Sequence, residues 1–539
     1  MEPNGVGNNR SVVPRWRPLG ETPSYELTVK PHGKRKPAVR AVTRFKDSLD
    51  ESTSKLFIAA SELESDLIDG PSSSTVKAAI YIISRTSEAT AELRGMAQRI
   101  VDRATPVADK FLDEGASGIR DKIYLQIRNF KRKLAEYPRD ALTSLELGRL
   151  YTVVGQPGRA KQFVERAAIL CPNDRYVLRS CASFFSHTDR PDIAYDIIKQ
   201  SELASVDSWV QAAELSVSVQ LGKIPRWAEH EIKRFHKLVH TRVNASELAA
   251  GLGSVELNNG SIRRARRLFE RSMDAPTENA LAQLRWTQTT GDLKNVANNR
   301  EFNIPQSYEA QAYAFYAREE PAGIVDAASK WLEYDPMSGH AAMLGSAYAT
   351  ISLRQYDRAV DIADRGLLSS PDNLMLINNK IVALAKGGHI DQAKALLPSI
   401  SRFKSDERAA FYYAASGLIA FVEGDEIGGR ELYALAMNAS RDCSNFERSL
   451  YAIIFWLEQE VDYTNFDTSY VLSARDKLAT IIDRHGVGRP ALKMAWRSVS
   501  ARIDQRIEVM RSDEPLLVHD NLQLTNAIED IAPELGLLL

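Results

Sequence analysis

The stretch Ala141–Asp174, ALTSLELGRLYTVVGQPGRAKQFVERAAILCPND, decides the fold of this chain. Its apolar and small residues recur at helical spacing on either side of Gly155–Gly158, which predicts two helices joined by a tight turn. Gly148 and Ala160 fall where the two helix backbones come closest, so a larger side chain at either position would push the helices apart. Pro172 ends the second helix.

The same pattern of small residues returns along the chain at a fixed interval. Ala160, Ala194 and Ala228 are 34 residues apart, and Ala359 and Ala393 repeat that interval. Periodicity of this kind is typical of helical solenoids. We expect the repeats to pack at Gly148, Tyr151, Ala160, Ala167, Ala194, Ala228, Gly253, Ala265, Phe269, Ala359, Ala393 and Gly417.

The pattern resembles the tetratricopeptide-repeat family, whose Leu-Gly-x-x-Tyr, Ala-x-x-x-Phe, Ala and Pro positions it matches nearly in full. The resemblance implies an all-α, right-handed superhelix of helical hairpins that binds a protein or peptide partner in its concave groove. We count about nine repeats of uneven quality over residues 138–445, of which the stretch 280–304 fits the pattern least well. From the composition and the repeat style we expect a bacterial protein.

Composition divides the rest of the chain into four regions. Residues 1–40 hold six prolines among glycines and basic residues, which predicts a disordered basic arm. Helical spacing predicts an N-terminal helical hairpin region over residues 41–137 and capping helices over residues 446–511. Residues 512–539 form an acidic, leucine-rich tail, and its apolar content predicts docking on this solenoid or on a partner.

The overall composition limits what the chain can do. Its 539 residues carry a net charge of −1, which implies no general attraction to nucleic acid or to a membrane surface. The sequence has no apolar run of about 18 residues, so we expect neither a membrane span nor a secretory signal. Three cysteines are too few for a disulfide framework and suit a reducing cytoplasm.

The sequence shows no constellation for catalysis, for a cofactor or for a metal. His236 and His240 are spaced as a metal pair on a helix, but no third ligand falls in register. Cys171 and Cys181 stand where small core residues belong, so we interpret them as packed rather than reactive. We therefore expect a scaffold without enzyme activity or cofactor, whose partner is a protein or peptide.

An arginine cluster suggests an alternative function. Guanidinium groups suit carboxylates and phosphates, so the cluster and the basic arm could together bind the backbone of a nucleic acid. A solvated charged face is the other interpretation, because in the family the second helices line the convex side whereas ligands lie in the concave groove. The cluster consists of Arg263, Arg264, Arg266, Arg267 and Arg271.

Overall fold

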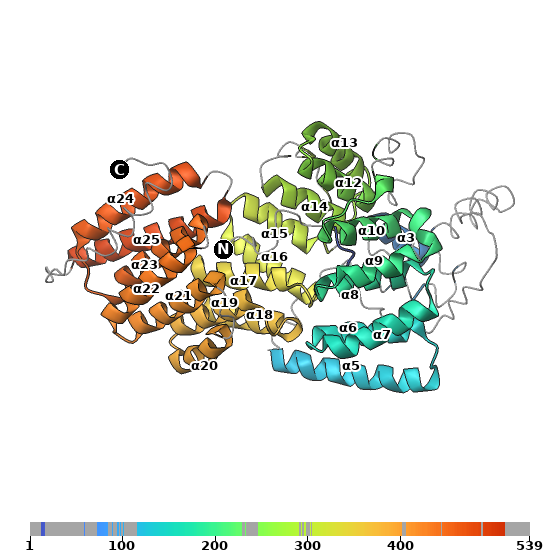
Figure 1. Ribbon diagram of the computed structural model, residues 1–539, viewed down its shortest axis with the longest axis horizontal. Helices are drawn as coiled ribbons and strands as arrows, with labels where there is room; N and C mark the ends of the chain where they lie inside the picture. Colours follow the sequence, from blue (N-terminus) through green and yellow to red (C-terminus); the bar gives the residue numbers. More distant parts are fainter. Residues whose placement is uncertain are drawn as a thin grey trace. The chain divides into compact units, whose positions relative to one another are not determined.

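The computed structural model describes residues 12–16, 73–84, 116–228, 246–289, 306–401, 406–442, 445–486 and 489–512, together with isolated positions between them. Every regular element in this part of the chain is helical, which confirms the prediction of an all-α fold. Consecutive helices pack as neighbouring pairs (Figure 1), as in a helical solenoid. The predictions for His236, His240 and the tail beyond Ser512 lie outside the described residues.

The chain divides into two compact units. The N-terminal unit comprises residues 8–288 and 292–310, and the C-terminal unit consists mainly of residues 311–539. The main boundary between the units falls between Ala310 and Gln311, inside the predicted repeat region 138–445 and shortly after the stretch 280–304, where the repeat pattern is weakest.

The N-terminal unit is built from helical hairpins whose first helices also contact one another. In sequence order, α6 pairs with α7, α8 with α9 and α12 with α13, while α6 contacts α8, α8 contacts α10, and α10 contacts α12. Each repeat therefore packs on its neighbours, as a solenoid requires. The helices are α3 (Ser73–Ser84), α5 (Ala116–Glu136), α6 (Ala141–Val153), α7 (Pro157–Leu170), α8 (Arg175–His187), α9 (Pro191–Lys199), η1 (Glu202–Ser205), α10 (Ser208–Gln220), α12 (Ser246–Asn258), α13 (Ile262–Ser272), α14 (Glu278–Thr289) and α15 (Tyr308–Ala317), the last of which continues into the C-terminal unit.

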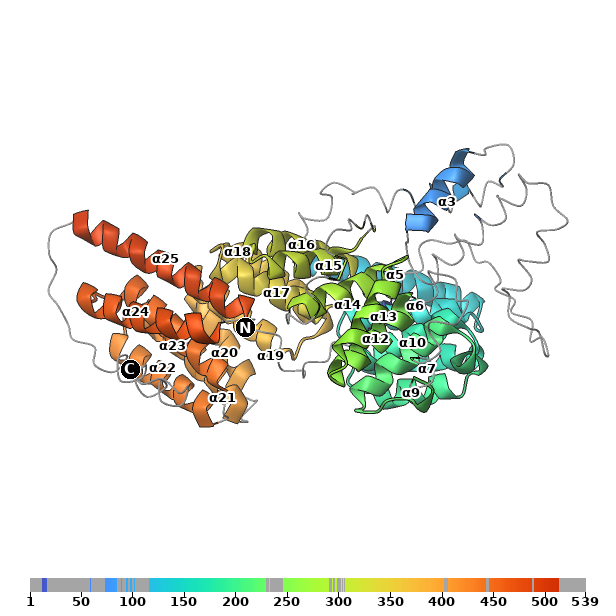
Figure 2. The same cartoon turned by 90° about the horizontal axis from the view of Figure 1, so that it is seen from above.

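The C-terminal unit repeats this arrangement and ends in three longer helices. The first helices α17, α19, α21 and α23 contact one another in order, and α25 packs on α23 and α24 (Figure 2). The last three helices occupy the region predicted to cap the solenoid. The helices are α16 (Pro321–Tyr334), α17 (Gly339–Ile351), α18 (Tyr356–Ser369), α19 (Leu374–Lys386), α20 (Ile390–Ser401), α21 (Asp406–Val422), α22 (Glu426–Asp442), α23 (Phe446–Tyr463), α24 (Thr468–His485) and α25 (Pro490–Ser512).

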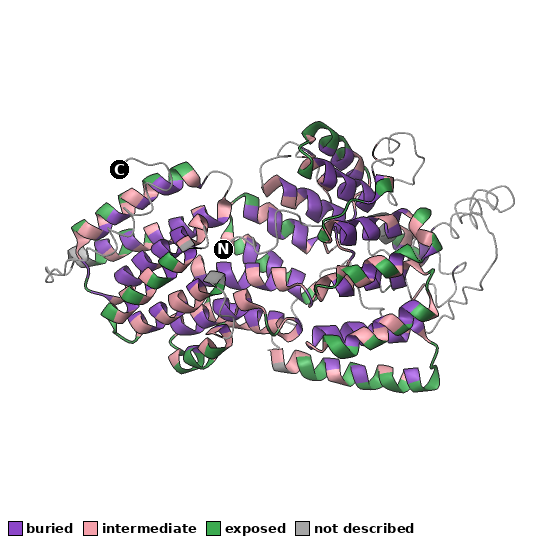
Figure 3. Ribbon diagram, viewed as in Figure 1, coloured by how far each residue is buried: buried purple, intermediate pink, exposed green. Residues whose placement is uncertain are grey.

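First and second helices differ in how much of their surface is buried. Nearly every residue of α6, α10 and the first three turns of α12 is buried, whereas α7 and α13 bury only one side (Figure 3). The first helices are therefore enclosed, and the second helices form the outer layer of the hairpins.

A glycine on the first helix lets the two helices of a hairpin approach closely. A Cβ added to Gly148 would lie 2.8 Å from Val164 Cγ2, and one added to Gly253 would lie 2.9 Å from the Phe269 ring. In both hairpins the glycine precedes its contact by 16 residues (148 and 164, 253 and 269), so the hairpins share one packing register. The same kind of contact recurs at Gly345 with Ile362 and at Gly417 with Tyr433. All twelve repeat positions named from the sequence are buried.

The turn after the first helix of eight repeats uses a residue with left-handed backbone. Three hairpins place Asp189, Glu319 and Arg354 there, with φ of 55°, 58° and 55°. Glycine has no Cβ to clash in this region, whereas other residues cost roughly 1–2 kcal/mol more. The remaining hairpins use Gly155, Gly222, Gly260, Gly388 and Gly424.

Candidate peptide-binding site

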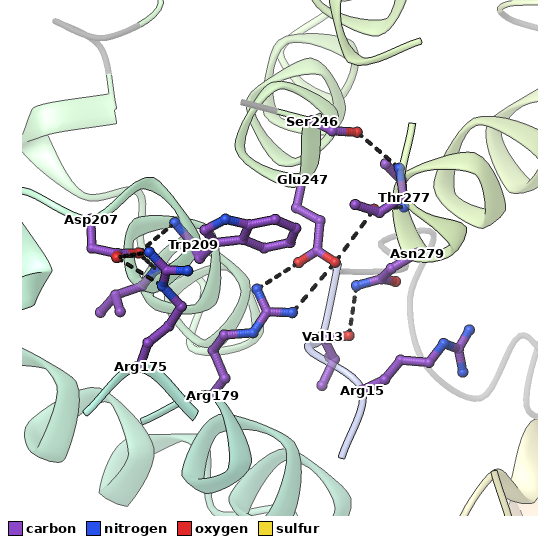
Figure 4. Close-up of polar contacts among 12 residues, drawn as sticks. Val13, Arg15, Arg175, Arg179, Asp207, Trp209, Ser246, Glu247, Thr277 and Asn279 are labelled. Carbon is purple, nitrogen blue, oxygen red and sulfur yellow. Dashed lines mark hydrogen bonds and ion pairs between the residues drawn. The ribbon is translucent and has the colours of Figure 1, made fainter. Parts of the chain in front are cut away.

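A short segment near the beginning of the chain, Val12–Trp16, packs on the first helices of the N-terminal unit. Val12 and Trp16 are 3% and 4% exposed, and Pro14 between them is also buried. The segment is not helical and passes beside Asn279 (Figure 4). The prediction of a disordered arm over residues 1–40 is therefore wrong for Val12–Trp16, because its valines and tryptophan supply the apolar surface that a packed segment needs.

The Trp16 side chain lies in a pocket formed by α6 and α8. Its ring meets Phe184 edge-to-face, with the two ring centroids 5.9 Å apart. On α6 the pocket depends on Gly148, where an added Cβ would lie 3.3 Å from Trp16 Cη2. A buried indole removes roughly 150–250 Å² from water, so this pocket provides the largest apolar contact of the segment.

The Arg15 guanidinium lies against two carboxylates. Its Nε is 3.0 Å from Glu278 Oε1, and its Nη2 forms an ion pair with Glu309. Both glutamate side chains are at most 5% exposed, so these ion pairs form away from water. Glu278 and Glu309 lie in the first turns of α14 and α15, where the helix dipole favours a negative charge. Two helix N-termini thus present carboxylates to one guanidinium, whose planar fork suits such pairing.

Asn279 holds the backbone of the segment. Its Nδ2 donates a hydrogen bond of 3.0 Å to the carbonyl oxygen of Val13. Val12 packs in an apolar cluster that includes Phe269 and Ala280. A backbone hydrogen bond is independent of sequence, whereas the surroundings of Arg15 and Trp16 depend on those side chains. Proteins that bind extended peptides combine the same two kinds of contact.

One buried and one partly buried ion pair link the helices near the segment. Arg179 of α8 pairs with Glu247 of α12 at 3.1 Å and lies over the Trp209 ring at 4.6 Å. Arg175 of α8 pairs with Asp207 at 2.6 Å, and the same carboxylate caps the N-terminus of α10. A charge removed from water needs its partner in place. These pairs therefore fix the spacing of α8, α10 and α12 (Figure 4).

The arginine cluster predicted from the sequence lies on α13 and faces solvent. Phe269 on the same helix faces the apolar cluster that contains Val12. Arg264 pairs with Glu256 at 3.5 Å and Arg271 pairs with Asp274 at 2.8 Å, so part of the charge is balanced locally. The exposed members are Arg263, Arg264, Arg266 and Arg267, and Arg271 is half-buried.

The thiols of Cys171 and Cys181 are unbonded. Burial raises the pKa of Cys181 to about 12, and the nearby Glu165 acts in the same direction. Burial also raises the pKa of the half-buried Cys171, with Asp174 and Asp140 adding to the effect. The thiolate is the reactive form of cysteine, so neither thiol is activated at neutral pH.

Among the residues that the structure describes, no three His, Cys, Asp or Glu side chains are grouped so that they could hold a metal ion. Within the same residues, no helix has both the length and the apolar character that crossing a membrane requires.

The C-terminal unit has a concavity of its own, bordered by α17, α19, α21, α22 and α23. The cavity is about 90 Å³ in volume, and apolar side chains such as Ile351, Val382 and Phe455 form most of its wall. Arg448 lies over the Phe411 ring at 4.9 Å, and Lys386 pairs with Glu458 at 2.6 Å. The C-terminal unit thus contains a cavity of its own, in which charged side chains lie among apolar ones.

Reasoning from sequence alone did not identify Arg15, Trp16, Glu278 or Glu309 as site residues. The available signal was the run Val-Val-Pro-Arg-Trp, which is apolar and aromatic within a proline-rich arm. Proline and the residue before it both favour extended backbone. Glu278 and Glu309 could not be singled out, because acidic residues are common in the first turn of any helix.

Together, these elements define a helical solenoid in which α6, α8, α14 and α15 contact a non-helical segment of the same chain. No protein-family model matches the sequence, and no curated protein matches it either. The fold and the contacts of Val12–Trp16 are therefore the basis on which a function is assigned.

Proposed function

We propose that this chain is a non-enzymatic scaffold or adaptor of the tetratricopeptide-repeat type, which binds a protein or peptide partner on the inner face of a right-handed superhelix. The observation that carries the proposal is the seating of Val12–Trp16 through an indole pocket, an ion pair and a backbone hydrogen bond. A separate peptide can make each of these contacts. The 34-residue period and the shared glycine register support the repeat assignment.

The proposed scaffold acts in the cytoplasm of a bacterium. The unbonded thiols of Cys171 and Cys181 support a reducing compartment, where cysteines remain as thiols. The repeat style supports the bacterial assignment.

Selection from a displayed library of random peptides tests the proposed function. The bait is the full chain carrying Arg15→Ala and Trp16→Ala, which removes the two side chains that anchor Val12–Trp16. The wild-type chain is the matched control, because its own segment occupies the site. We expect peptides to be enriched on the variant only, and hydrogen exchange in α6, α8 and α14 to slow when they bind. The proposal is refuted if the variant keeps its helical content and enriches no peptide.

Association with nucleic acid is the second candidate, and the exposure of Arg263, Arg266 and Arg267 supports it. Contacts of this kind involve the phosphate backbone, so the affinity falls steeply as salt rises. Fluorescence anisotropy with labelled DNA and RNA at low salt measures it. Reversing the three charges to Glu should abolish binding, whereas Lys161→Glu should leave it nearly unchanged. Undetectable binding by the wild-type chain at low salt would exclude this function.

A further inference from the structure

We infer that the inner face of the N-terminal unit recognises extended peptides that present arginine followed directly by tryptophan, and that Val12–Trp16 is an internal competitor for the same site. The inference rests on the proposed function and specifies the partner: an extended, basic and aromatic segment of another protein.

Selection for arginine follows from the two carboxylates that face Arg15. Glu278 and Glu309 are at most 5% exposed, so a ligand without a cation would leave them away from water and without this counter-charge. A lysine ammonium brings the charge but not the planar fork that meets two carboxylates at once. The expected order of preference at this position is therefore arginine, then lysine, then any neutral residue.

Selection for tryptophan follows from the pocket that α6 and α8 form around Trp16. Phe184 packs edge-to-face on the indole, and the missing side chain at Gly148 leaves room for its far edge. A smaller ring would leave part of this space unfilled, and unfilled apolar space is destabilising. Gly148 also lets α6 approach α7, so the pocket is a direct consequence of how the hairpin packs.

The order of the two residues follows from the backbone. Arg15 and Trp16 are neighbours in the chain but contact different helices. Arg15 reaches α14 and α15, whereas Trp16 reaches α6 and α8. The hydrogen bond from Asn279 to the carbonyl oxygen of Val13 sets the register two residues earlier. A peptide with tryptophan before arginine would therefore place the indole near the carboxylates of α14 and α15 and the guanidinium near the apolar pocket of α6 and α8.

The internal segment competes strongly because it is tethered to its site. A binding group on the same chain as its site has an effective concentration that reaches about millimolar for short linkers. A separate peptide with the same contacts therefore binds poorly to the wild-type chain, and a natural partner must add contacts outside Val12–Trp16 to displace it.

The test uses a labelled peptide with the sequence of residues 10–18, RSVVPRWRP, titrated by fluorescence anisotropy into the full chain carrying Arg15→Ala and Trp16→Ala. We expect binding to this variant and at least about tenfold weaker binding to the wild-type chain. Peptides with citrulline in place of Arg15, or with alanine in place of Trp16, should bind the variant at least about 30-fold more weakly, the usual effect of truncating an interface hot spot.

A matched chain separates the ion pair from other effects of the citrulline. When Glu278→Gln and Glu309→Gln are added to the same variant, the arginine and citrulline peptides should bind equally, because the charges that select arginine are gone. A peptide with Arg15 and Trp16 in reversed order should bind both chains weakly.

Hydrogen exchange on the wild-type chain provides a measurement that does not depend on how well the variant folds. Saturating peptide should speed exchange at Val12–Trp16 by displacing it, while α17–α23 stay unchanged. Equal binding of the arginine and citrulline peptides to the carboxylate-bearing variant would overturn the inference but leave the proposed function standing. If neither the titration nor the library selection detects a bound peptide, both are refuted.

Discussion

A single added methyl group at Gly148 should destabilise the N-terminal unit. In Gly148→Ala the new Cβ would lie 2.8 Å from Val164 Cγ2, 3.3 Å from Trp16 Cη2 and 3.4 Å from the Ala160 carbonyl oxygen. Alanine gains about 0.5–1 kcal/mol over glycine as a helix former, whereas overpacking a core costs about 1–3 kcal/mol. The two effects leave a net loss of about 1 kcal/mol in the free energy of unfolding.

Gly158 in the same hairpin provides the matched control. A Cβ added there would meet no heavy atom within 4 Å, and Gly158 follows Pro157 at the start of α7. Gly158→Ala should therefore be neutral or stabilise by up to about 1 kcal/mol, because it only reduces the freedom of the unfolded chain. The two variants, which make the same chemical change, should differ by about 1–2 kcal/mol.

Hydrogen exchange measures this difference locally, which matters in a chain of two units that need not unfold together. Gly148→Ala should speed exchange in α6 and α7, and also at Val12–Trp16 because the methyl intrudes on the indole pocket. Gly158→Ala should leave all three slow. Equal exchange in the two variants, or slower exchange in Gly148→Ala, would refute the reasoning that this glycine permits close helix packing.

Three further outcomes test the packing and the titratable groups. Ala160→Leu should cost about 1–3 kcal/mol in a thermal melt, whereas Lys161→Leu on the exposed side should cost little; equal losses would contradict the repeat register. Asp140→Ala should cost about 1 kcal/mol by removing the N-cap of α6. Burial raises the pKa of Asp140, but hydrogen bonds from Thr143 outweigh this effect, so the pKa in the folded chain is lowered. The cap therefore stabilises α6 fully above the ordinary aspartate pKa, and this stabilisation is lost as the pH falls through the pKa of the folded chain. Urea melts of the wild type and the variant should converge at acidic pH. Iodoacetamide should label Cys181 only after unfolding, because burial raises its pKa, and rapid labelling of the native chain detected by mass spectrometry would contradict this.

The hairpins could be predicted from the sequence because their signals are local. Gly148 and Val164 meet within one pair of helices, and Gly155 supplies the left-handed turn between them. The weak repeat at residues 280–304 was also visible in the sequence, whereas the boundary between the units after Ala310 was not. Whether a weak repeat interrupts a solenoid depends on how its neighbours pack on it, and the local pattern does not contain that information.

The site could not be predicted because its parts are distant in the sequence. Arg15 and Glu309 are 294 residues apart, and they meet only after the rotations of several repeats have accumulated. Charge density drew attention to Arg266 and its neighbours instead, yet exposure is the ordinary state of charged side chains. Burial of a charge together with its partners is the informative feature, and it becomes visible only in the folded chain.

The separation between Arg15 and Glu309 also has a consequence for biosynthesis. A ribosome adds about 5–20 residues per second, so roughly 15–60 s pass between the synthesis of the two residues. Throughout this interval Val12–Trp16 has been made while part of its site has not, so the segment is open to contact with other molecules in the cell. Its seating marks the moment when α15 has been translated and packed, which makes it a late step in the maturation of the nascent chain.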